Sequence, residues 1–374
     1  MSDICEFVKG KTLVSELDEK TYISTENMLP NKMGLTLASS LPSTERTQAY
    51  YKNDVLISNI RPYFKKIWKA EWDGGCSTDV LVFRAKTGVC QDYLYYVLAD
   101  DKFFEYSMAT SKGTKMPRGD KTSIMQYEVE LPTYEEQAKI ASILSDFEKK
   151  IKLNNKINNN LLEQAQAVFS QEFLSFDTIP DGWQESSLLG IADYLNGLAM
   201  QKFRPKDGEH GLPVLKIKEL RQGTCDSNSE LCSPSIKKEY IVRDGDVIFS
   251  WSGSLLVDLW CGGTCGLNQH LFKVTSNSFD KWFYYAWTNH HLQKFAAIAA
   301  NMATTMGHIK REELAKAEVL VPPKDEYDRI GKLLSPIYDL VIANRIENRK
   351  LATLRDALLP RLMSGELDVS SIDI

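Results

Sequence analysis

The chain repeats itself at a constant offset, and this repeat limits the folds it can adopt more than any other feature. Residues 114–173 align with residues 304–363 without a gap, so that Glu128-Val129-Glu130-Leu131-Pro132 falls on Glu318-Val319-Leu320-Val321-Pro322. Upstream, with small gaps, Asp54-Val55-Leu56-Ile57-Ser58 resembles Asp246-Val247-Ile248-Phe249-Ser250. A repeat this long indicates a duplicated domain, because solenoid units span only about 20 to 50 residues.

Each copy begins with a part of mixed secondary structure. Runs of β-branched and aromatic residues, such as Val80-Leu81-Val82-Phe83, predict strands, and residues 92–107 and 280–299 have helical character. We therefore predict an α+β fold with two similar mixed α/β domains, joined by two long helices that form an antiparallel coiled coil with pseudo-twofold symmetry. The predicted domains are residues 1–131 and 176–321, and the helical spacer regions are residues 132–175 and 322–374.

Each helical region is predicted to contain a short helix and then a long one. Ser145 begins Ser145-Asp146-Phe147-Glu148, a capping box, and Ser335 precedes Pro336, which is favoured at the first position of a helix. We therefore expect helix boundaries at Ser145 and Ser335. The long helices would end near Phe173 and Met363, at a length of roughly 40 Å.

Apolar residues in both long helices recur at alternating steps of four and three, which is typical of a coiled coil. The predicted seams are Leu144, Phe147, Ile151, Asn154, Asn158, Leu161, Ala165 and Val168 in the first helix, and Leu333, Ile337, Leu340, Asn344, Glu347, Leu351, Leu354 and Leu358 in the second. In an antiparallel pair, Asn154 and Asn158 can meet Asn344 and Asn348 and fix the register. The alternative is that these asparagines face water.

Composition places the chain among soluble globular proteins but does not favour a nucleic-acid binder. It has 374 residues, 43% of them hydrophobic, and a net charge of −5. Many nucleic-acid-binding domains are clearly basic, so any DNA contact would come from local basic loops. The first residues lack the basic and apolar parts of a signal peptide, and we expect a cytoplasmic protein. The seven cysteines have irregular spacings, and the pair Cys261 and Cys265 lacks partners for a zinc site, so we expect buried reduced thiols and no metal.

Several catalytic motifs are missing from the sequence. It has no Asn-Pro-Pro-aromatic turn or glycine-rich cofactor loop of a DNA methyltransferase, no phosphate-binding loop and no His-Glu-x-x-His site. The one histidine pair, His290-His291, is expected to cap a helix or face solvent. We therefore name no catalytic residue.

If the chain binds nucleic acid, two polar loops in each half are the candidate contacts, because recognition residues concentrate on loops that a scaffold positions. Arginine can contact guanine with two hydrogen bonds, and lysine and threonine suit phosphates. The alternative for any one of these residues is a solvated surface position. The candidates are Arg61, Tyr63, Lys65, Lys66, Lys112, Thr114, Lys115 and Arg118 in the first half, and Trp251, Ser252, Thr304, Thr305, His308 and Lys310 in the second.

Several short segments in both halves resemble segments of a known protein family. They are the helix junctions Leu131-Pro132-Thr133-Tyr134-Glu135-Glu136-Gln137-Ala138-Lys139-Ile140 and Val321-Pro322-Pro323-Lys324-Asp325-Glu326-Tyr327-Asp328-Arg329-Ile330, the opening Ile179-Pro180-Asp181-Gly182-Trp183, the turn Gly245-Asp246-Val247-Ile248-Phe249-Ser250, Asn268-Gln269-His270, and Leu362-Met363-Ser364-Gly365-Glu366-Leu367. With the duplication, their order resembles the specificity subunit of Type I restriction-modification systems over nearly the whole chain. Two departures are a first half without the Pro-Asp-Gly-Trp opening, and Tyr327 where the family's glutamine is expected.

The resemblance implies a non-catalytic subunit of a DNA methyltransferase and restriction complex. Each domain would recognise one half of a bipartite target in double-stranded DNA, and the helices would set the spacing and dock two methyltransferase subunits. S-adenosylmethionine would bind those partners, not this chain, and a motor-nuclease subunit can join. One alternative is a two-domain adaptor that binds only protein partners, which the acidic net charge favours slightly; another is an enzyme with an unfamiliar site.

Overall fold

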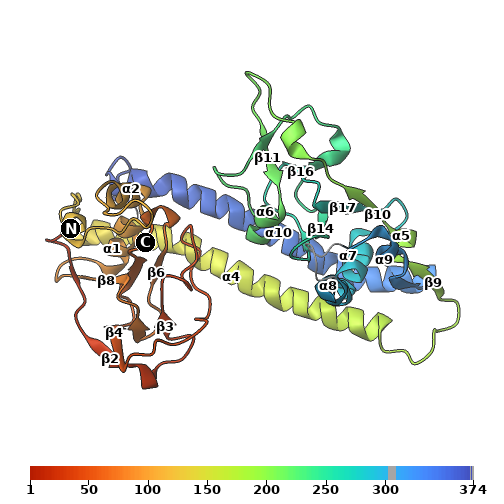
Figure 1. The fold of residues 1–374 in the computed structure, drawn as a ribbon, viewed down its shortest axis with the longest axis horizontal. Coiled ribbons are helices and arrows are strands. Elements are labelled where there is room, and N and C mark those ends of the chain that lie inside the picture. Colours follow the sequence, from red (N-terminus) through yellow and green to blue (C-terminus); the bar gives the residue numbers. More distant parts are fainter. Residues whose placement is uncertain (302–308, 371, 373–374) are drawn as a thin grey trace. The chain divides into compact units, whose positions relative to one another are not determined.

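The computed structural model describes residues 1–301, 309–370 and 372. The chain divides into two compact units, the first comprising Met1–Lys149 and Ala352–Ile374 and the second Lys150–Leu351. Each unit holds one globular domain and part of both long helices (Figure 1). Among the described residues, no helix is long and apolar enough to cross a membrane.

The domain of the first unit contains two four-stranded sheets and three short helices. One sheet has the order β1-β8-β5-β6 and is antiparallel throughout; the other has the order β2-β4-β7-β3 and includes one parallel pair, β3 with β7. The bounds are β1 (Cys5–Phe7), β2 (Lys11–Leu13), β3 (Tyr22–Ile23), β4 (Arg46–Tyr50), β5 (Val55–Ser58), β6 (Ile67–Lys69), β7 (Gly74–Cys76), β8 (Val80–Ala85), α1 (Gln91–Ala99), α2 (Asp101–Ala109) and α3 (Lys121–Met125), with one-turn 3-10 helices at Val14–Glu16 and Pro62–Phe64.

The domain of the second unit has the same plan. Its sheets have the orders β10-β17-β14-β15 and β12-β11-β16-β13, and a two-stranded sheet pairs β18 with β9. The bounds are β9 (Gln184–Ser187), α5 (Leu188–Ile191), β10 (Asp193–Asn196), β11 (Leu212–Leu215), α6 (Ile217–Gln222), β12 (Leu231–Cys232), β13 (Ile241–Val242), β14 (Val247–Ser250), β15 (Leu256–Leu259), β16 (Cys265–Leu267), β17 (Leu271–Thr275), α7 (Lys281–His290), α8 (Leu292–Asn301), α9 (Arg311–Ala315) and β18 (Glu318–Val321), with 3-10 helices at Met200–Lys202 and Lys238–Tyr240.

The two domains are copies of one scaffold, which confirms the predicted duplication. The sheet order β1-β8-β5-β6 corresponds strand by strand to β10-β17-β14-β15, and the parallel pair β3-β7 corresponds to β11-β16. Helices α3 and α9 are related by the same offset that aligns residues 114–173 with residues 304–363. The copies differ at opposite edges of their second sheet, because β2 extends it beyond β4 in the first domain, whereas β12 extends it beyond β11, the counterpart of β3, in the second.

Two long helices follow the domains, α4 (Tyr134–Phe173) and α10 (Lys324–Met363). Each has 40 residues, and their first and last residues are equivalent in the repeat. At a rise of 1.5 Å per residue, each is about 60 Å long, not the roughly 40 Å that we expected. The predicted boundaries at Ser145 and Ser335 are therefore wrong, because both serines lie inside continuous helices.

The capping box that starts α4 lies twelve positions before the one that the sequence suggested. Thr133 Oγ1 accepts a hydrogen bond from the Glu136 N–H, and the Glu136 carboxylate accepts one from the Thr133 N–H at 2.8 Å. Ser145 instead donates its hydroxyl to the carbonyl of Ser142, one turn earlier in the same helix. In α10, the helix passes through Pro336 because buried Leu334 and Tyr338 anchor it to the domain core on both sides of the proline.

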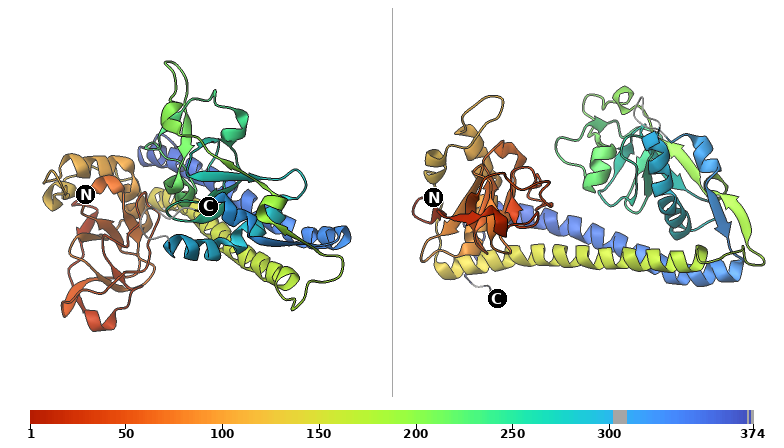
Figure 2. Two further views of the ribbon diagram at one scale, coloured as in Figure 1. Left: turned by 45° about the vertical axis from the view of Figure 1, so that its right-hand side comes forward. Right: turned by 60° about the horizontal axis from the view of Figure 1, so that its bottom comes forward.

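The two long helices are antiparallel within the second unit, as predicted (Figure 2). Contacts pair Asn154 with Asn348, and Glu172 with Arg329, so residue numbers rise on one helix as they fall on the other. The seam predicted for α4 is buried or half-buried throughout. The seam predicted for α10 is partly wrong.

Three leucines of that second seam are 45% to 52% exposed: Leu333, Leu340 and Leu354. The buried face of α10 lies one position further along the chain, at Leu334 and Val341. The reason is that α10 packs against the second domain as well as against α4, since Leu334 belongs to the main core of the second unit. A strict coiled-coil pattern accounts for only one of these two contacts.

Candidate nucleic-acid interface

The structure brings together the two loops of the first half that were chosen separately from the sequence. These are residues 59–66, between β5 and β6, and residues 111–119, between α2 and α3. Arg61 N–H donates to the carbonyl of Pro117 at 2.7 Å, and Gly119 N–H donates to the carbonyl of Asn59 at 3.1 Å. Gly119 has little free space, because a Cβ atom would lie 2.8 Å from Asn59 Oδ1 and 2.9 Å from Ser107 Oγ.

A third loop, residues 30–33, completes this surface and was missed by the sequence analysis. Asn31 and Lys32 donate their backbone N–H groups to the carbonyls of Phe64 and Lys65, at 2.8 and 2.9 Å. Nothing in the sequence pairs this loop with residues 59–66. We call residues 30–33, 59–66 and 111–119 the three-loop surface; they contain seven lysines and arginines and no aspartate or glutamate.

Acidic residues outside the three-loop surface hold several of its cations. Lys32 and Lys65 both form ion pairs with Asp101, at 2.8 and 2.7 Å. Burial acts to raise the pKa of Asp101, but the hydrogen bonds from these two lysines outweigh it and lower the pKa overall. Asp101 therefore ties two of the loops to the start of α2.

The loop 111–119 is anchored in the same way. Lys112 forms an ion pair with Asp120. The hydrogen bonds that Asp120 accepts from Lys112 and from the Ser123 N–H lower the pKa of Asp120 to about 2. Arg118 pairs with Asp79 at 3.3 Å while its side chain stays 54% exposed. Contact with a phosphate would exchange these exposed pairs for new ones, and solvent screening makes exposed pairs contribute little to stability.

The remaining candidates of the first half differ in how available they are. Thr114 and Lys115 are exposed, and Tyr63 is 48% exposed. Lys66 is half-buried and donates to the carbonyl of Thr25 at 2.6 Å, and burial lowers its pKa. The Nε atom of half-buried Arg61 is buried without a hydrogen-bond partner.

The second domain repeats the loop contact of the first. Ile309 N–H donates to the carbonyl of Trp251 at 3.0 Å, the equivalent of the bond from Gly119 to Asn59. Lys310 is exposed. The candidates Thr304, Thr305 and His308 lie outside the described residues.

Trp251 and Ser252 are held inside the second domain. Trp251 is half-buried, and its Nε1 donates to Asn196 Oδ1 at 3.0 Å. Ser252 is only 2% exposed and lies 3.2 Å from His270 Nδ1. Ser252 therefore stabilises the loop from inside and has little exposed surface that a ligand could contact.

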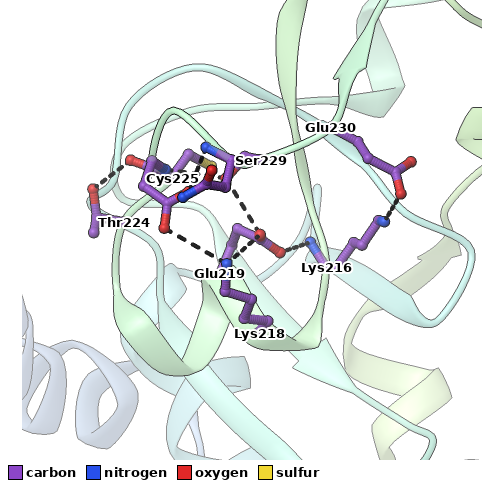
Figure 3. A network of polar contacts seen from close by, with 9 residues as sticks. Lys216, Lys218, Glu219, Thr224, Cys225, Ser229 and Glu230 are labelled. Carbon is purple, nitrogen blue, oxygen red and sulfur yellow. Dashed lines mark hydrogen bonds and ion pairs between the residues drawn. The ribbon is translucent and has the colours of Figure 1, made fainter. Parts of the chain in front are cut away.

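A polar network orders a further loop of the second domain, residues 223–230 (Figure 3). Its centre is Glu219 of α6, which is 3% exposed and accepts hydrogen bonds from the Ser229 hydroxyl and the Lys216 N–H, both at 3.2 Å. Lys216 in turn pairs with Glu230. All of these partners lie within residues 216–230, a segment that no motif in the sequence marks.

The four asparagines named for the coiled coil lie together in the second unit. Asn154 Nδ2 donates to Asn348 Oδ1, and Asn344 Nδ2 donates to Asn158 Oδ1, both at 2.9 Å. Asn154 is 1% exposed, and its amide also donates to Glu347. A polar cluster of this kind can select one register, because any other register leaves buried amides without partners.

The loops of the first domain form a charged and aromatic surface suited to binding. In the part of the chain that the structure describes, no group of histidine, cysteine, aspartate and glutamate side chains is arranged to hold a metal ion. The three-loop surface combines cations with exposed aromatic rings, a combination suited to a polyanion that also carries flat bases.

Comparison with known proteins identifies the family. The family model described as Type I restriction modification DNA specificity domain matches residues 1–163 and again residues 180–355. The chain belongs to this family. It is a Type I restriction-modification specificity subunit with two target-recognition domains.

Relatives with curated descriptions agree over most of the chain. The MjaIX specificity subunit of Methanocaldococcus jannaschii is 26% identical over 77% of this chain and 71% of that protein. The HindI specificity subunit of Haemophilus influenzae is 21% identical over 98% of both chains. The crystal structure of the Type I S subunit from M. genitalium has the same fold, with a TM-score of 0.57 at 14% identity, over 97% of this chain and 94% of that one.

Proposed function

We propose that this chain gives a Type I restriction-modification complex its sequence specificity, each domain recognising one half of a bipartite target in double-stranded DNA. The observation that carries the proposal is the recurrence of one loop-to-loop contact, Gly119 to Asn59 and Ile309 to Trp251, at equivalent positions of a duplicated scaffold. A protein that reads two half-sites needs two equivalent scaffolds whose loops differ in sequence.

Local charge supports DNA as the ligand. The chain as a whole has a net charge of −5, but the three-loop surface has seven cationic and no acidic residues. Phosphate contacts made by such residues release counterions, so binding weakens with the logarithm of the salt concentration. In this proposal Lys115 and Arg118 contact phosphates or guanine, because both side chains are exposed.

The long helices would set the distance between the half-sites and bind two methyltransferase subunits. The exposed leucines Leu333, Leu340 and Leu354 of α10 are apolar surface that a partner subunit can cover. The asparagine contacts between α4 and α10 would hold the register that the spacing depends on. Adenine methylation, with S-adenosylmethionine, would take place in the partners, since we assign this chain no catalytic residue; a motor-nuclease subunit would bind the same assembly.

A mobility-shift experiment with co-expressed methyltransferase subunits tests the proposal. The complex should bind a duplex that contains the methylated motif of the host at least 1,000-fold more tightly than a scrambled duplex, the lower end for specific DNA-binding proteins. The methyltransferase subunits alone serve as the control. If the complex assembles but binds both duplexes equally, the chain is a protein-binding adaptor.

A further inference from the structure

The two copies of the scaffold differ in one loop, which joins β5 to β6 in the first domain and β14 to β15 in the second. In the first domain β5 ends at Ser58 and β6 begins at Ile67, which leaves eight residues between them. In the second domain β14 ends at Ser250 and β15 begins at Leu256, which leaves five. The longer loop contains a one-turn 3-10 helix, Pro62–Phe64, that the second domain lacks at this position.

This turn is held in an unfavourable backbone conformation. Arg61 and Lys65, on either side of it, have φ values of +51° and +50°, in the left-handed region that costs a residue other than glycine about 1 kcal/mol or more. Arg61 also precedes a proline, which favours extended backbone. Five non-glycine residues have positive φ in the described chain, and four of them lie in the touching loops 30–33 and 59–66.

Hydrogen bonds from neighbouring loops maintain the turn. The carbonyls of Phe64 and Lys65 accept N–H groups from Asn31 and Lys32, and Arg61 N–H donates to Pro117. Strain of this kind persists only where the surroundings enforce it, and it is concentrated at functional sites. The second domain shows no positive φ at a described residue other than glycine.

The strained turn presents two adjacent aromatic rings to solvent. Tyr63 is 48% exposed and Phe64 36% exposed, with ring centroids 4.6 Å apart and planes inclined by 51°. The Lys66 ammonium lies 5.7 Å from the centre of the Phe64 ring. Aromatic surface bordered by lysines and an arginine suits nucleobases flanked by phosphates, because the cations bind the backbone while the rings contact base faces.

We infer that Tyr63 and Phe64 form a wedge that enters a base-pair step in the half-site of the first domain, an inference that rests on the proposed function. Apolar side chains that enter a step unstack it and bend the duplex, so flexible pyrimidine–purine steps are favoured without any base-edge hydrogen bond. The equivalent loop of the second domain, residues 251–255, presents no such wedge, because Trp251 is bonded to Asn196 and packs on Phe272. Only one half of the target would be distorted.

The test measures unstacking directly, with the fluorescence of 2-aminopurine in duplexes that carry the mapped methylation motif. The probe replaces, one at a time, the purines of both half-sites other than the methylated adenine. The complex of this chain with its methyltransferase subunits should raise the fluorescence at one step of one half-site only. The double variant Tyr63→Ser with Phe64→Ser should abolish that signal and weaken binding about 10-fold.

Further variants separate a wedge from a loss of structure. Tyr63→Leu with Phe64→Leu keeps apolar side chains and should restore most of the signal, because leucine also serves as a wedge. Tyr51→Ser, at a 49% exposed position before β5 and outside the three-loop surface, is the matched control and should change nothing. Since neither ring is charged, the serine variant should keep the wild-type dependence of binding on salt.

Two results would overturn the inference. One is specific binding by the wild-type complex with no fluorescence change in either half-site. The other is a fluorescence change that persists in the serine variant. Equal binding of target and scrambled duplexes by the wild type would instead contradict the proposed function, so the two failures are distinguishable.

Discussion

Gln137 and Tyr327 occupy equivalent positions of the repeat and do the same structural task with different side chains. Gln137 Oε1 accepts the backbone N–H of Cys90 at 2.9 Å, and the Tyr327 hydroxyl accepts that of Asp280 at 2.8 Å. Cys90 and Asp280 are the N-cap residues of α1 and α7, and neither makes a side-chain cap of its own. The start of each long helix is thereby fixed to the start of a domain helix.

Removing the tyrosine hydroxyl should weaken the second unit measurably. We expect Tyr327→Phe to lower the free energy of unfolding by about 1–2 kcal/mol, because the Asp280 N–H loses its partner in a half-buried position. Urea denaturation followed by circular dichroism measures the change. Tyr134→Phe, also in the first turn of a long helix but 60% exposed, is the control. Equal stability of the two variants would contradict the assigned role.

The asparagine cluster predicts a cost for losing one member. Asn154→Ala should lower the free energy of unfolding by about 1–3 kcal/mol, because Asn348 and Glu347 lose a shared donor inside the helix pair. Asn159→Ala, on an exposed position of the same helix, should be neutral or slightly stabilising, since alanine has the higher helix propensity. The same denaturation experiment compares the two variants. An unchanged free energy of unfolding in Asn154→Ala would contradict the proposal that the asparagine contacts fix the register of the helices.

Acidification should destabilise the second unit through His291. This residue caps α7, as the sequence suggested, but it is buried, and its Nε2 donates to the carbonyl of Glu318 at 2.8 Å. Burial lowers the pKa of His291, and the Glu318 contact offsets this only in part. Because the unfolded ring has a pKa near ~6.5, its contribution is present above that pH and is lost as the pH falls through the lower folded value.

Denaturation at pH 8 and at pH 5 tests this sign. The wild type should lose more stability on acidification than His291→Gln, in which the titrating ring is absent. His210→Gln, at an exposed position of the same unit, is the matched control. If His291→Gln lost more free energy of unfolding than the wild type between pH 8 and pH 5, the assigned role of His291 would be contradicted.

The cationic loops predict a specific change in salt dependence. Lys115→Ala with Arg118→Ala should weaken DNA binding by the assembled complex and reduce the slope of log K against log salt by about one to two units, one per lost phosphate contact. Lys149→Ala with Lys156→Ala on α4 removes the same charge elsewhere and should leave the slope unchanged. Unchanged binding and slope in the first variant would remove these residues from the interface.

The repeat carried most of the fold that could be predicted. Its constant offset relates α3 to α9 and α4 to α10, and runs of β-branched and aromatic residues placed strands such as β5 and β14. The helix boundaries failed because Ser145 and Pro336 have strong local preferences that burial of Leu144 and Leu334 overrides. Local sequence preferences determine where a helix ends only where tertiary packing does not favour its continuation.

The candidate interface was predictable loop by loop but not as one surface. The polar composition of residues 59–66 and 111–119 selected both, while their contact through Arg61 and Pro117 depends on distant chain segments. Loop 30–33 and its link through Asp101 had no signal in the sequence, because an ion pair 69 residues apart leaves no periodic trace. The difference in loop length behind Tyr63 and Phe64 became visible only once the strands could be matched.

Mapping methylated adenines in host DNA, with and without the gene for this chain, shows whether the chain specifies a bipartite target. We expect a motif of two short specified segments separated by a fixed unspecified gap, and its loss when the gene is deleted. A methylation pattern that survives the deletion, or a motif that is one continuous sequence, would contradict this expectation.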